Sequence, residues 1–390
     1  MRILHVVPTY LPATRYGGPI YAVHGLCRAL VARGHEVDVF TTNVDGEGDS
    51  DVPLGVRVNL DGVGVHYFAS PSAGFFAHLQ RRVYASRTLR TALAGHLATY
   101  DVLHLHSVFL LPTYVAARIA ERVHVPYIVS PRGMLVPDLI HRKSRLVKNV
   151  WIRLVERRTF LHSSAIHFTA QREWDEARRI PIPLPDPFIV PNGIDLPSDT
   201  STPRLANTLL FLGRINWKKG LDRLLDAVKA VPNVKVVIAG NDEEELTPKL
   251  RAQAERNGIS SRVAFRGPVS GVAKEELLRT ATALVLPSLS ENFGNVILEA
   301  LAVRMPVIVT PEVGLASDVA LAGAGLVTSG LPEPLSVAIN TLMSDSEARA
   351  VMGRRGRALV EARFTWDRVA TQMEKHYLRI VTAARVAPVK

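Results

Sequence analysis

The stretch ILHVVPTYLPATRYGGPIYAVHGLCRALVARGHEVDVFTT (residues 3–42) contains one complete repeat of a parallel-sheet fold. It opens with an apolar segment that predicts a strand, and a loop with Gly17 and Gly18 follows. Residues 20–34 carry apolar side chains at helical spacing and end at a glycine, which favours the end of a helix. Residues 36–42 then predict a second strand. A strand, a glycine loop, a helix and a strand form a βαβ unit, which indicates a parallel sheet.

The same alternation continues along the chain and then starts again. Buried strands are expected in the first half at 102–106, 127–130, 165–169 and 187–192. A segment rich in Pro, Asp and Ser (181–203) ends as a linker. Strands are expected after it at 208–214, 234–240, 263–267, 283–288 and 306–310. The sequence therefore predicts an α/β protein with two Rossmann-like domains facing a cleft. The expected boundaries are 1–195, 205–365 and a final helical segment, 366–390.

The composition is that of a soluble globular protein, with 390 residues of which 47% are hydrophobic and 21% charged. Cys27 is the single cysteine, which excludes an internal disulfide and a cysteine-based zinc site and favours a reducing compartment. Neither a signal peptide nor a membrane-spanning run is apparent, so we expect a cytoplasmic protein. The net charge of +11 favours an anionic partner.

PSLSENFGNVILEAL (287–301) has two glutamates eight positions apart. Its first residues end a predicted strand, and the residues after Gly294 predict a helix with Asn292 as its N-cap. Glu291 then lies before the helix and Glu299 lies inside it. The free N–H groups of the helix N-terminus favour an anion, and the glycine lets a ligand approach the backbone closely. An anion flanked by two carboxylates matches a nucleotide sugar, in which hydroxyl groups lie on both sides of a diphosphate.

Basic residues and glycines follow the first strand of each half. Arg214 ends the strand at 208–214 and Lys219 follows it, and ligands of parallel sheets bind at the carboxyl ends of the strands. Arginine offers a planar fork of donors and lysine a mobile point charge, so both suit a diphosphate. Gly17 and Gly18 occupy the corresponding place in the first half, where bare backbone can approach a phosphate.

Taken in order, these elements resemble the retaining glycosyltransferases of family 4, the group 1 type, which have the GT-B fold. The resemblance covers nearly the whole chain, including VPNGID (190–195) and FTWDRVA (364–370). It implies transfer of a sugar from a UDP- or GDP-linked donor to a glycan or lipid-linked acceptor with retention of configuration. It also implies an N-terminal acceptor domain, a C-terminal donor domain and a last helix that crosses back to the N-terminal domain.

The resemblance implies a role for each matching residue. Arg214 and Lys219 bind the donor diphosphate, and Glu299 binds the ribose hydroxyl groups. Glu291 contacts the transferred sugar. The other donor contacts are expected from Gly17, Gly18, Arg266, Gly267, Asn292, Phe293, Gly294 and Asn295.

The acceptor side offers two candidate catalytic groups. Family members often have a histidine after the strand that reads YIVS here; this chain has Arg132 in that neighbourhood, and His106 at the end of VLHLH is the other candidate. We expect His104 to point away from His106, and a metal site of this pair is disfavoured because no third ligand is close in sequence. The expected reaction needs no cofactor and no metal, because Arg214, Lys219 and the helix end stabilise the leaving diphosphate.

HRKSRLVKNVWIRLVERR (141–158) contains seven Lys or Arg residues and one Glu. Apolar residues at helical spacing, with Trp151, predict a helix with a basic face. Such a helix is either solvated or in contact with an anionic membrane or a lipid-diphosphate acceptor. The second interpretation predicts peripheral association with the inner face of the cell membrane and a role in cell-surface polysaccharide synthesis.

Three other functions compete with this one. A glycosidase needs two carboxylates but has no use for the phosphate-binding set. A nucleotide-sugar epimerase on the same fold needs no acceptor, so incubation with donor alone separates the two enzymes. A basic protein that binds nucleic acid or membranes without catalysis fits the charge, but only 6% of residues are aromatic and no nucleic-acid recognition motif is present. We therefore expect a glycosyltransferase that does not bind nucleic acid.

Overall fold

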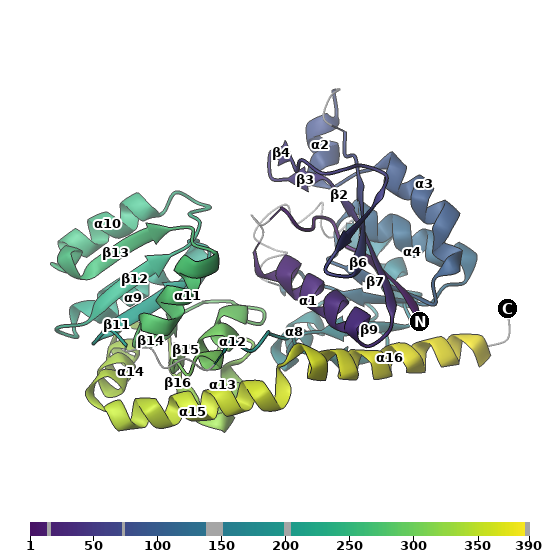
Figure 1. Cartoon of the computed structure of the whole chain (residues 1–390). Coiled ribbons are helices and arrows are strands. Elements are labelled where there is room, and N and C mark those ends of the chain that lie inside the picture. Colours follow the sequence, from purple (N-terminus) through teal and green to yellow (C-terminus); the bar gives the residue numbers. More distant parts are fainter. Residues whose placement is uncertain (14–16, 72–74, 138–150, 199–203, 387–390) are drawn as a thin grey trace. The chain divides into compact units, whose positions relative to one another are not determined.

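The chain forms two compact α/β units, shown in Figure 1. The computed structural model describes residues 1–13, 17–71, 75–137, 151–198 and 204–386. Unit 1 comprises Met1–Gly193 together with Trp366–Lys390, and unit 2 comprises Ile194–Thr365. Each unit contains a parallel sheet with helices on its faces, so the predicted class of two Rossmann-like domains is confirmed.

Unit 1 is built on an eight-stranded sheet in the order β10-β9-β8-β7-β1-β2-β6-β5. Its strands are β1 (Arg2–Val6), β2 (Glu36–Thr42), β5 (Arg57–Leu60), β6 (Val63–Phe68), β7 (Val102–His106), β8 (Tyr127–Ser130), β9 (Ala165–Phe168) and β10 (Pro187–Ile189). Only β5 is antiparallel to its neighbour. A hairpin of β3 (Val44–Asp45) and β4 (Gly48–Asp49) lies outside this sheet. The order reverses at β1, which makes the carboxyl ends of β1 and β7 the switch point.

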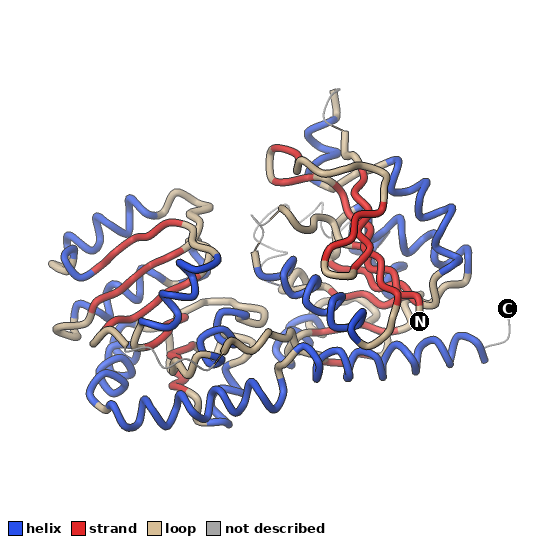
Figure 2. The backbone as a smooth tube through the Cα atoms, in the orientation of Figure 1, coloured by secondary structure: helices blue, strands red, loops and turns tan. Residues whose placement is uncertain are grey.

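Helices cover both faces of this sheet (Figure 2). They are α1 (Gly18–Ala32), α2 (Ala77–Arg82), α3 (Arg87–His96), α4 (Leu111–Val123), α7 (Arg157–Leu161), α8 (Gln171–Ala177) and α16 (Trp366–Val386), with a π-helical turn at Ile152–Glu156 and a 3-10 turn at Leu97–Thr99. Because side chains alternate along a strand, Leu4 packs into the core under α3 and α4, whereas Ile3 packs into the core under α1 and α16.

The last helix, α16, packs on unit 1 beside α1. The Trp366 ring fits against two glycines: a Cβ atom would come within 2.2 Å of it at Gly25 and within 2.5 Å at Gly193. Farther along, Glu374 forms an ion pair of 2.6 Å with Arg33. Glycine at these two places therefore permits the close approach of helix and core. The predicted return of the final helix to the N-terminal domain is confirmed.

Unit 2 contains a six-stranded parallel sheet in the order β13-β12-β11-β14-β15-β16. Its strands are β11 (Thr208–Leu212), β12 (Lys235–Ala239), β13 (Val263–Gly267), β14 (Ala283–Leu286), β15 (Val307–Val309) and β16 (Gly325–Val327). Its helices are α9 (Leu221–Lys229), α10 (Thr247–Arg256), α11 (Gly271–Thr280), α12 (Asn295–Ala302), α13 (Ala316–Ala322), α14 (Pro332–Ser344) and α15 (Ser346–Arg363), with 3-10 turns at Trp217–Lys219 and Ser260–Arg262. The switch point of this sheet lies between β11 and β14.

The segments that begin and end unit 2 lie side by side. Ile194 forms an isolated parallel bridge with Thr365, and its N–H group donates to the carbonyl of Phe364 at 2.8 Å. Unit 2 is thus one continuous piece of chain whose two ends are hydrogen-bonded to each other.

No helix in the described parts of the chain combines the length and the hydropathy that a membrane crossing requires.

Candidate active site

The switch point of unit 2 brings together the two loops that carry most of the predicted site. The loop after β11 and the loop after β14 are joined by a hydrogen bond of 2.6 Å from the Leu289 N–H group to the Lys218 carbonyl. Gly220 lies in the same contact, with a φ of 62°. A Cβ atom there would lie 2.2 Å from the carbonyl oxygen of Pro287. The contact therefore requires glycine at this position.

Lys219 and Glu291 form an ion pair across these two loops. Both side chains are largely buried, with 13% and 21% of their surface exposed. The structure thus joins two residues that the sequence assigned to one donor site, although 72 positions separate them.

Arg214, the second predicted phosphate ligand, extends from the same loop. Its guanidinium forms an ion pair of 2.9 Å with Glu243, which lies in the loop after β12, and about half of its side chain is exposed. The neighbouring Glu244 accepts a hydrogen bond of 3.0 Å from the Trp217 N–H group. The sequence analysis did not identify these two acidic residues, because their role depends on the adjacency of β11 and β12. Their signal was the run of glutamates 243–245 directly after a predicted strand.

Helix α12 begins at the predicted residue, but the prediction of its N-cap was wrong. Asn292 is not its N-cap; Gly294 takes that place with a φ of 93°, and the helix begins at Asn295. We expected an N-cap with extended backbone, which suits asparagine. The observed N-cap has a left-handed backbone conformation, which favours glycine. Phe293 is buried and packs edge-on against Phe364, with ring centroids 6.3 Å apart. The side chain of Phe293 therefore anchors the loop, and only its backbone is available for a ligand.

Glu299, the predicted ribose ligand, lies on the second turn of α12. It forms an ion pair of 2.7 Å with Lys274 of α11, and both side chains are partly exposed. Sequence reasoning missed Lys274, because the sequence of α11 does not indicate that this helix lies beside α12.

The remaining predicted donor residues lie at sheet ends and helix starts. Arg266 is exposed at the carboxyl end of β13, and the carbonyl of Gly267 accepts a hydrogen bond of 2.7 Å from Gly240. In unit 1, Gly17 has a φ of 68° and precedes α1, whose first residue is Gly18. Helix α1 thus offers N–H groups at its start, as the sequence suggested.

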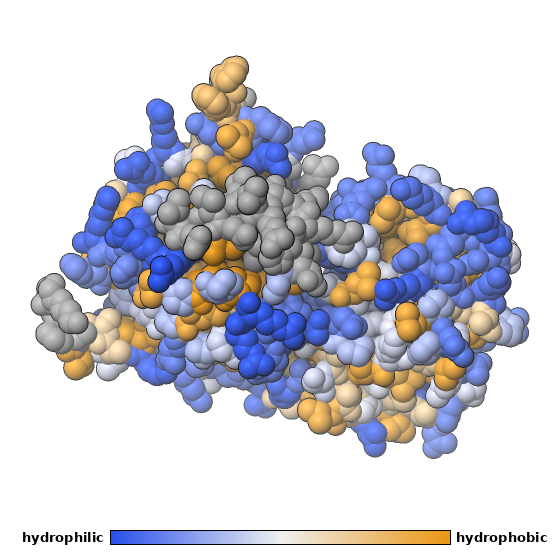
Figure 3. Space-filling view, turned by 180° about the vertical axis from the view of Figure 1, so that it is seen from behind, coloured by the Kyte–Doolittle hydropathy of each residue, from blue (hydrophilic) through white to orange (hydrophobic). Residues whose placement is uncertain are grey.

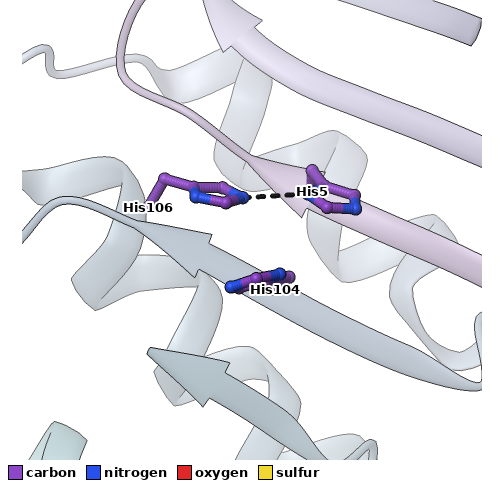
Figure 4. A group of neighbouring side chains, drawn as sticks. All are labelled: His5, His104 and His106. Carbon is purple, nitrogen blue, oxygen red and sulfur yellow. Dashed lines mark hydrogen bonds between the residues drawn. The ribbon is translucent and has the colours of Figure 1, made fainter. Parts of the chain in front are cut away.

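The switch point of unit 1 contains a cluster of buried histidines (Figure 4). His104 and His106 lie on the same side of β7, with ring centroids 4.2 Å apart. The expectation that they point in opposite directions was wrong, because residues two apart on a strand share a face. His5 of the neighbouring β1 stacks on His106 at 5.1 Å. His5 is the third histidine of the cluster. Sequence reasoning missed it because β1 and β7 are far apart in the chain and become neighbours only in the sheet.

Hydrogen bonds assign the protons of His106 and His5. The Arg132 guanidinium, which can only donate, lies 3.3 Å from Nδ1 of His106, so this nitrogen accepts. Nε2 of His106 then carries the proton and donates to Nδ1 of His5 at 2.8 Å. The proton of His5 is consequently on Nε2, which is buried and has no hydrogen-bond partner among the described residues.

A second set of bonds connects α16 to the same cluster. Nε2 of His167 lies 2.8 Å from the carbonyl of Val190 and must donate to it. Nδ1 of His167 accepts from Nε2 of His104 at 3.3 Å, and Nδ1 of His104 accepts from the Tyr377 hydroxyl at 2.7 Å. Neutral imidazoles satisfy this pattern. Burial lowers the pKa of His5 to about 3 and the pKa of the other three histidines well below the ordinary value.

Arg132 and His106, the two acceptor-side candidates, are in direct contact. Arg132 follows β8 with a left-handed φ of 55°, and its guanidinium also donates to Oδ1 of Asn192 at 2.8 Å. Burial lowers the pKa of this guanidinium. The two residues that the sequence offered as alternatives therefore form one group, and Asn192 is a partner that sequence reasoning missed.

The three histidines of Figure 4 were tested as a metal site. Their ligand nitrogens lie within 4.8 Å of one another, and imidazole is a common zinc ligand. A metal bound to Nε2 of His106 would leave a proton on Nδ1, opposite the donor groups of Arg132, and would add positive charge beside that guanidinium. The arrangement therefore fits a hydrogen-bonded neutral cluster better than a metal site. A reaction without metal stays a prediction.

Most of the predicted basic helix, residues 141–150, lies outside the described residues. In the described part, Nε1 of Trp151 donates to the Glu156 carboxylate at 3.0 Å. Glu156 is buried, which raises its pKa, and it also accepts from the Phe109 N–H group. Trp151 is therefore hydrogen-bonded within unit 1, and contact of this segment with a membrane stays a prediction.

Known proteins resemble this chain over its whole length. Residues 17–193 match the family described as Glycosyl transferase 4-like domain, and residues 198–359 match Glycosyl transferases group 1. A D-inositol 3-phosphate glycosyltransferase of Jonesia denitrificans is 27% identical, with 99% of this chain and 97% of that protein covered.

Solved structures give the same result for the fold. Sucrose-phosphate synthase from Thermosynechococcus elongatus has a TM-score of 0.75 at 20% identity, covering 98% of this chain and 99% of its own. HepE of Anabaena, in complex with UDP and glucose, has a TM-score of 0.74 at 19% identity, covering 97% and 100%. With two matching domains, two Rossmann-like units and the returning helix, the chain belongs to the glycosyltransferases of the group 1 type, with the GT-B fold.

Proposed function

We propose that the protein transfers a sugar from a nucleotide-sugar donor, UDP- or GDP-linked, to an acceptor with retention of anomeric configuration. The observation that carries this proposal is the meeting of Lys219, Glu291 and Arg214 at the carboxyl ends of β11 and β14. The relative HepE, which has the same fold, was solved with UDP and glucose. That structure supports a uridine nucleotide as the first donor to test.

In the proposed mechanism, the donor diphosphate replaces carboxylates as the partner of the two cations. Lys219 is paired with Glu291 and Arg214 with Glu243 in the ligand-free protein. A diphosphate carries more charge than one carboxylate and accepts bidentate bonds from arginine. Glu291, once released from Lys219, accepts hydrogen bonds from the hydroxyl groups of the transferred sugar. The start of α12 adds N–H groups, and together these groups stabilise the negative charge that develops on the leaving diphosphate.

The acceptor is proposed to be a glycan or lipid-linked glycan that binds to unit 1. The group of His106 and Arg132 is buried at the switch point of that unit, where ligands of such sheets bind. The relative from Jonesia denitrificans is named for a phosphorylated polyol, D-inositol 3-phosphate, so a phosphorylated acceptor belongs in any screen. We place the reaction on the cytoplasmic side of the membrane, in cell-surface polysaccharide synthesis.

A thermal-shift screen of UDP-, GDP- and ADP-sugars tests the donor. A bound donor stabilises the native state by mass action, about 2.7 kcal/mol at a hundredfold excess over Kd. We expect one nucleotide class to raise Tm in the wild type and to lose this effect in Lys219→Ala. The anomeric proton couplings of the product, read by NMR, test retention. Epimerised sugar formed from donor alone would favour an epimerase instead.

Metal independence is tested with the same assay. Arg214 and Lys219 already supply positive charge beside the proposed diphosphate, and a further cation would be repelled. We expect the rate of transfer to be unchanged in excess EDTA. A rate that disappears with EDTA and returns with Mg²⁺ or Mn²⁺ would overturn this part of the proposal.

A further inference from the structure

A short segment of unit 1 exposes large apolar side chains to solvent. Phe75 is 96% exposed, Phe76 62% and Leu79 59%. The two phenylalanine rings pack edge-on against each other, with centroids 5.0 Å apart. Figure 3 shows apolar atoms at the projecting end of the α2 segment that Figure 1 labels. Scattered exposed apolar residues are ordinary, but an aromatic pair with a leucine one turn away forms a patch that marks a contact surface.

The same part of the chain carries charge of one sign only. No Asp or Glu occurs between Asp61 and Asp101. Arg82, Arg87 and Arg90 are exposed, and no ion pair of these three is present within the described ranges. A surface with charge of one sign is complementary to an anionic bilayer, whose surface is negative throughout.

Helix α2 is held firmly in this position. Arg81, unlike its neighbours, forms an ion pair of 2.7 Å with Asp49 and donates to the Gly48 carbonyl at 2.5 Å. Both partners belong to the small hairpin of β3 and β4. The aromatic pair therefore lies at the start of a helix whose position is fixed by bonds to the hairpin.

A cavity of about 400 Å³ lies next to the patch, bounded by α2, α3 and the start of α4. Its lining includes Arg87, Arg90, Leu89, Leu111, Pro112 and Val115. A lining that contains both arginines and apolar residues suits a phosphate group that is attached to an acyl glycerol, because the phosphate and the hydrocarbon each meet side chains of matching chemistry.

We propose that residues 75–90, here called the docking patch, bind the surface of an anionic lipid bilayer. Phe75, Phe76 and Leu79 lie at the boundary between headgroups and acyl chains, and Arg82, Arg87 and Arg90 contact lipid phosphates. The inference adds a defined surface to the membrane association in the proposed function. It does not depend on the donor chemistry of unit 2.

Flotation of the purified full chain with lipid vesicles tests the proposal. Vesicles of phosphatidylcholine mixed with phosphatidylglycerol should carry the protein to the top of the gradient at low salt, and vesicles of phosphatidylcholine alone should not. Because each arginine near an anionic leaflet contributes about a fivefold factor in partitioning, Arg82→Glu/Arg87→Glu/Arg90→Glu should lower it by about 100-fold or more. Phe75→Ser/Phe76→Ser should lower it by about tenfold or more.

Matched controls lie in unit 2. Lys249→Glu/Arg256→Glu/Arg354→Glu makes the same change of net charge at exposed positions, and Val272→Ser/Leu321→Ser removes two apolar side chains that are 83% and 88% exposed. Both control proteins should float like the wild type. The thermal shift with nucleotide sugars is measured on every variant and should be unchanged. If the docking-patch proposal is wrong, flotation fails; if the donor proposal is wrong, the thermal shift fails, so the two outcomes are distinguishable.

A tryptophan at the tip gives a second readout. Because Phe75 is almost fully exposed, Phe75→Trp leaves the fold intact, and lipids brominated on the acyl chains should quench its emission beyond that of the wild-type background. A wild type that ignores anionic vesicles would overturn the proposal, as would Phe75→Ser/Phe76→Ser floating like the wild type. A concentration-dependent dimer in light scattering that Phe75→Ser/Phe76→Ser reduces to a monomer would assign the patch to a second copy and also overturn it.

Discussion

Lys219 is neutralised by Glu291 in the ligand-free protein, and Arg214 by Glu243. These contacts hold the two cations near the place that we propose for the donor diphosphate. In the proposed mechanism a diphosphate displaces both ion pairs. The Arg214 pair is partly exposed and worth little in water, whereas the Lys219 pair is largely buried.

At this scale, Arg214→Ala and Lys219→Ala should each lower kcat/KM by about 100-fold or more, as expected for the loss of one preformed electrostatic contact to a leaving group. A steady-state transfer assay measures the effect. Lys218→Ala is the matched control: its side chain lies over the Trp217 ring, and its activity should stay within about twofold of the wild type. Wild-type rates in both Ala variants would remove the diphosphate assignment.

The buried histidines should make stability depend on pH. His5, His104, His106 and His167 have folded-state pKa values below the ordinary value of 6.5, so the unfolded chain binds more protons below that pH. The free energy of unfolding is therefore unaffected by them above about pH 6.5 and falls as the pH drops. When all four histidines are protonated in the unfolded state and neutral in the folded state, the free energy of unfolding changes by about 5 kcal/mol per pH unit.

Urea unfolding followed by circular dichroism between pH 7.5 and 5 measures this slope. His167→Gln should lower this slope by the contribution of one histidine. Glutamine can donate to the Val190 carbonyl and accept from His104 in the same place. A shallow slope in the wild type would show that the cluster opens to solvent.

At the scale of the elements, Gly240 permits the close approach of the end of β12 to the loop that contains Gly213 and Arg214. Its φ is 151°, and a Cβ atom there would lie 1.8 Å from the carbonyl of Gly213. Gly240→Ala should therefore displace Gly213 and Arg214, destabilise unit 2 by about 3 kcal/mol or more and weaken the donor thermal shift.

Gly258→Ala separates backbone strain from crowding. Gly258 has a φ of 68°, and no atom lies within 4 Å of the position that a Cβ atom would take there. Its substitution should therefore cost only about 1–2 kcal/mol and leave donor binding intact. Urea unfolding and the thermal shift measure both effects. Equal losses in the two variants would contradict the crowding at Gly240.

The elements themselves could largely be predicted, because their apolar periodicity is local. Strands such as β7 and β13 have the expected bounds, and α12 ends within one residue of the expected position. The N-cap of α12 was misplaced because Asn292 and Gly294 both favour a helix start, and only the surrounding loop decides between them. The partners of the site residues could not be predicted, since Glu243, Lys274 and the histidine of β1 depend on which strands and helices become neighbours.

At the scale of the whole molecule, Tyr377 ties the end of the chain to the sheet of unit 1. Tyr377→Phe should leave Nδ1 of His104 as a buried acceptor without a partner, at a cost of about 1–3 kcal/mol. In urea unfolding followed by hydrogen exchange, protection should fall in unit 1 and stay unchanged in unit 2. Tyr21→Phe, at an exposed position, should change neither. A loss shared equally by both units would mean that they unfold together.

The adjacency of Ile194 and Thr365 has a consequence for synthesis on the ribosome. Residues 1–193 are synthesised before α16, so the part of their core that packs on α16 stays uncovered until that helix follows, although α1 already covers the adjoining part. Unit 2 emerges later and is complete earlier, because all its residues are contiguous. The nascent N-terminal half therefore presents part of its apolar surface while unit 2 folds. A premature stop shortly after Thr365 would release a folded unit 2 attached to an unfinished unit 1.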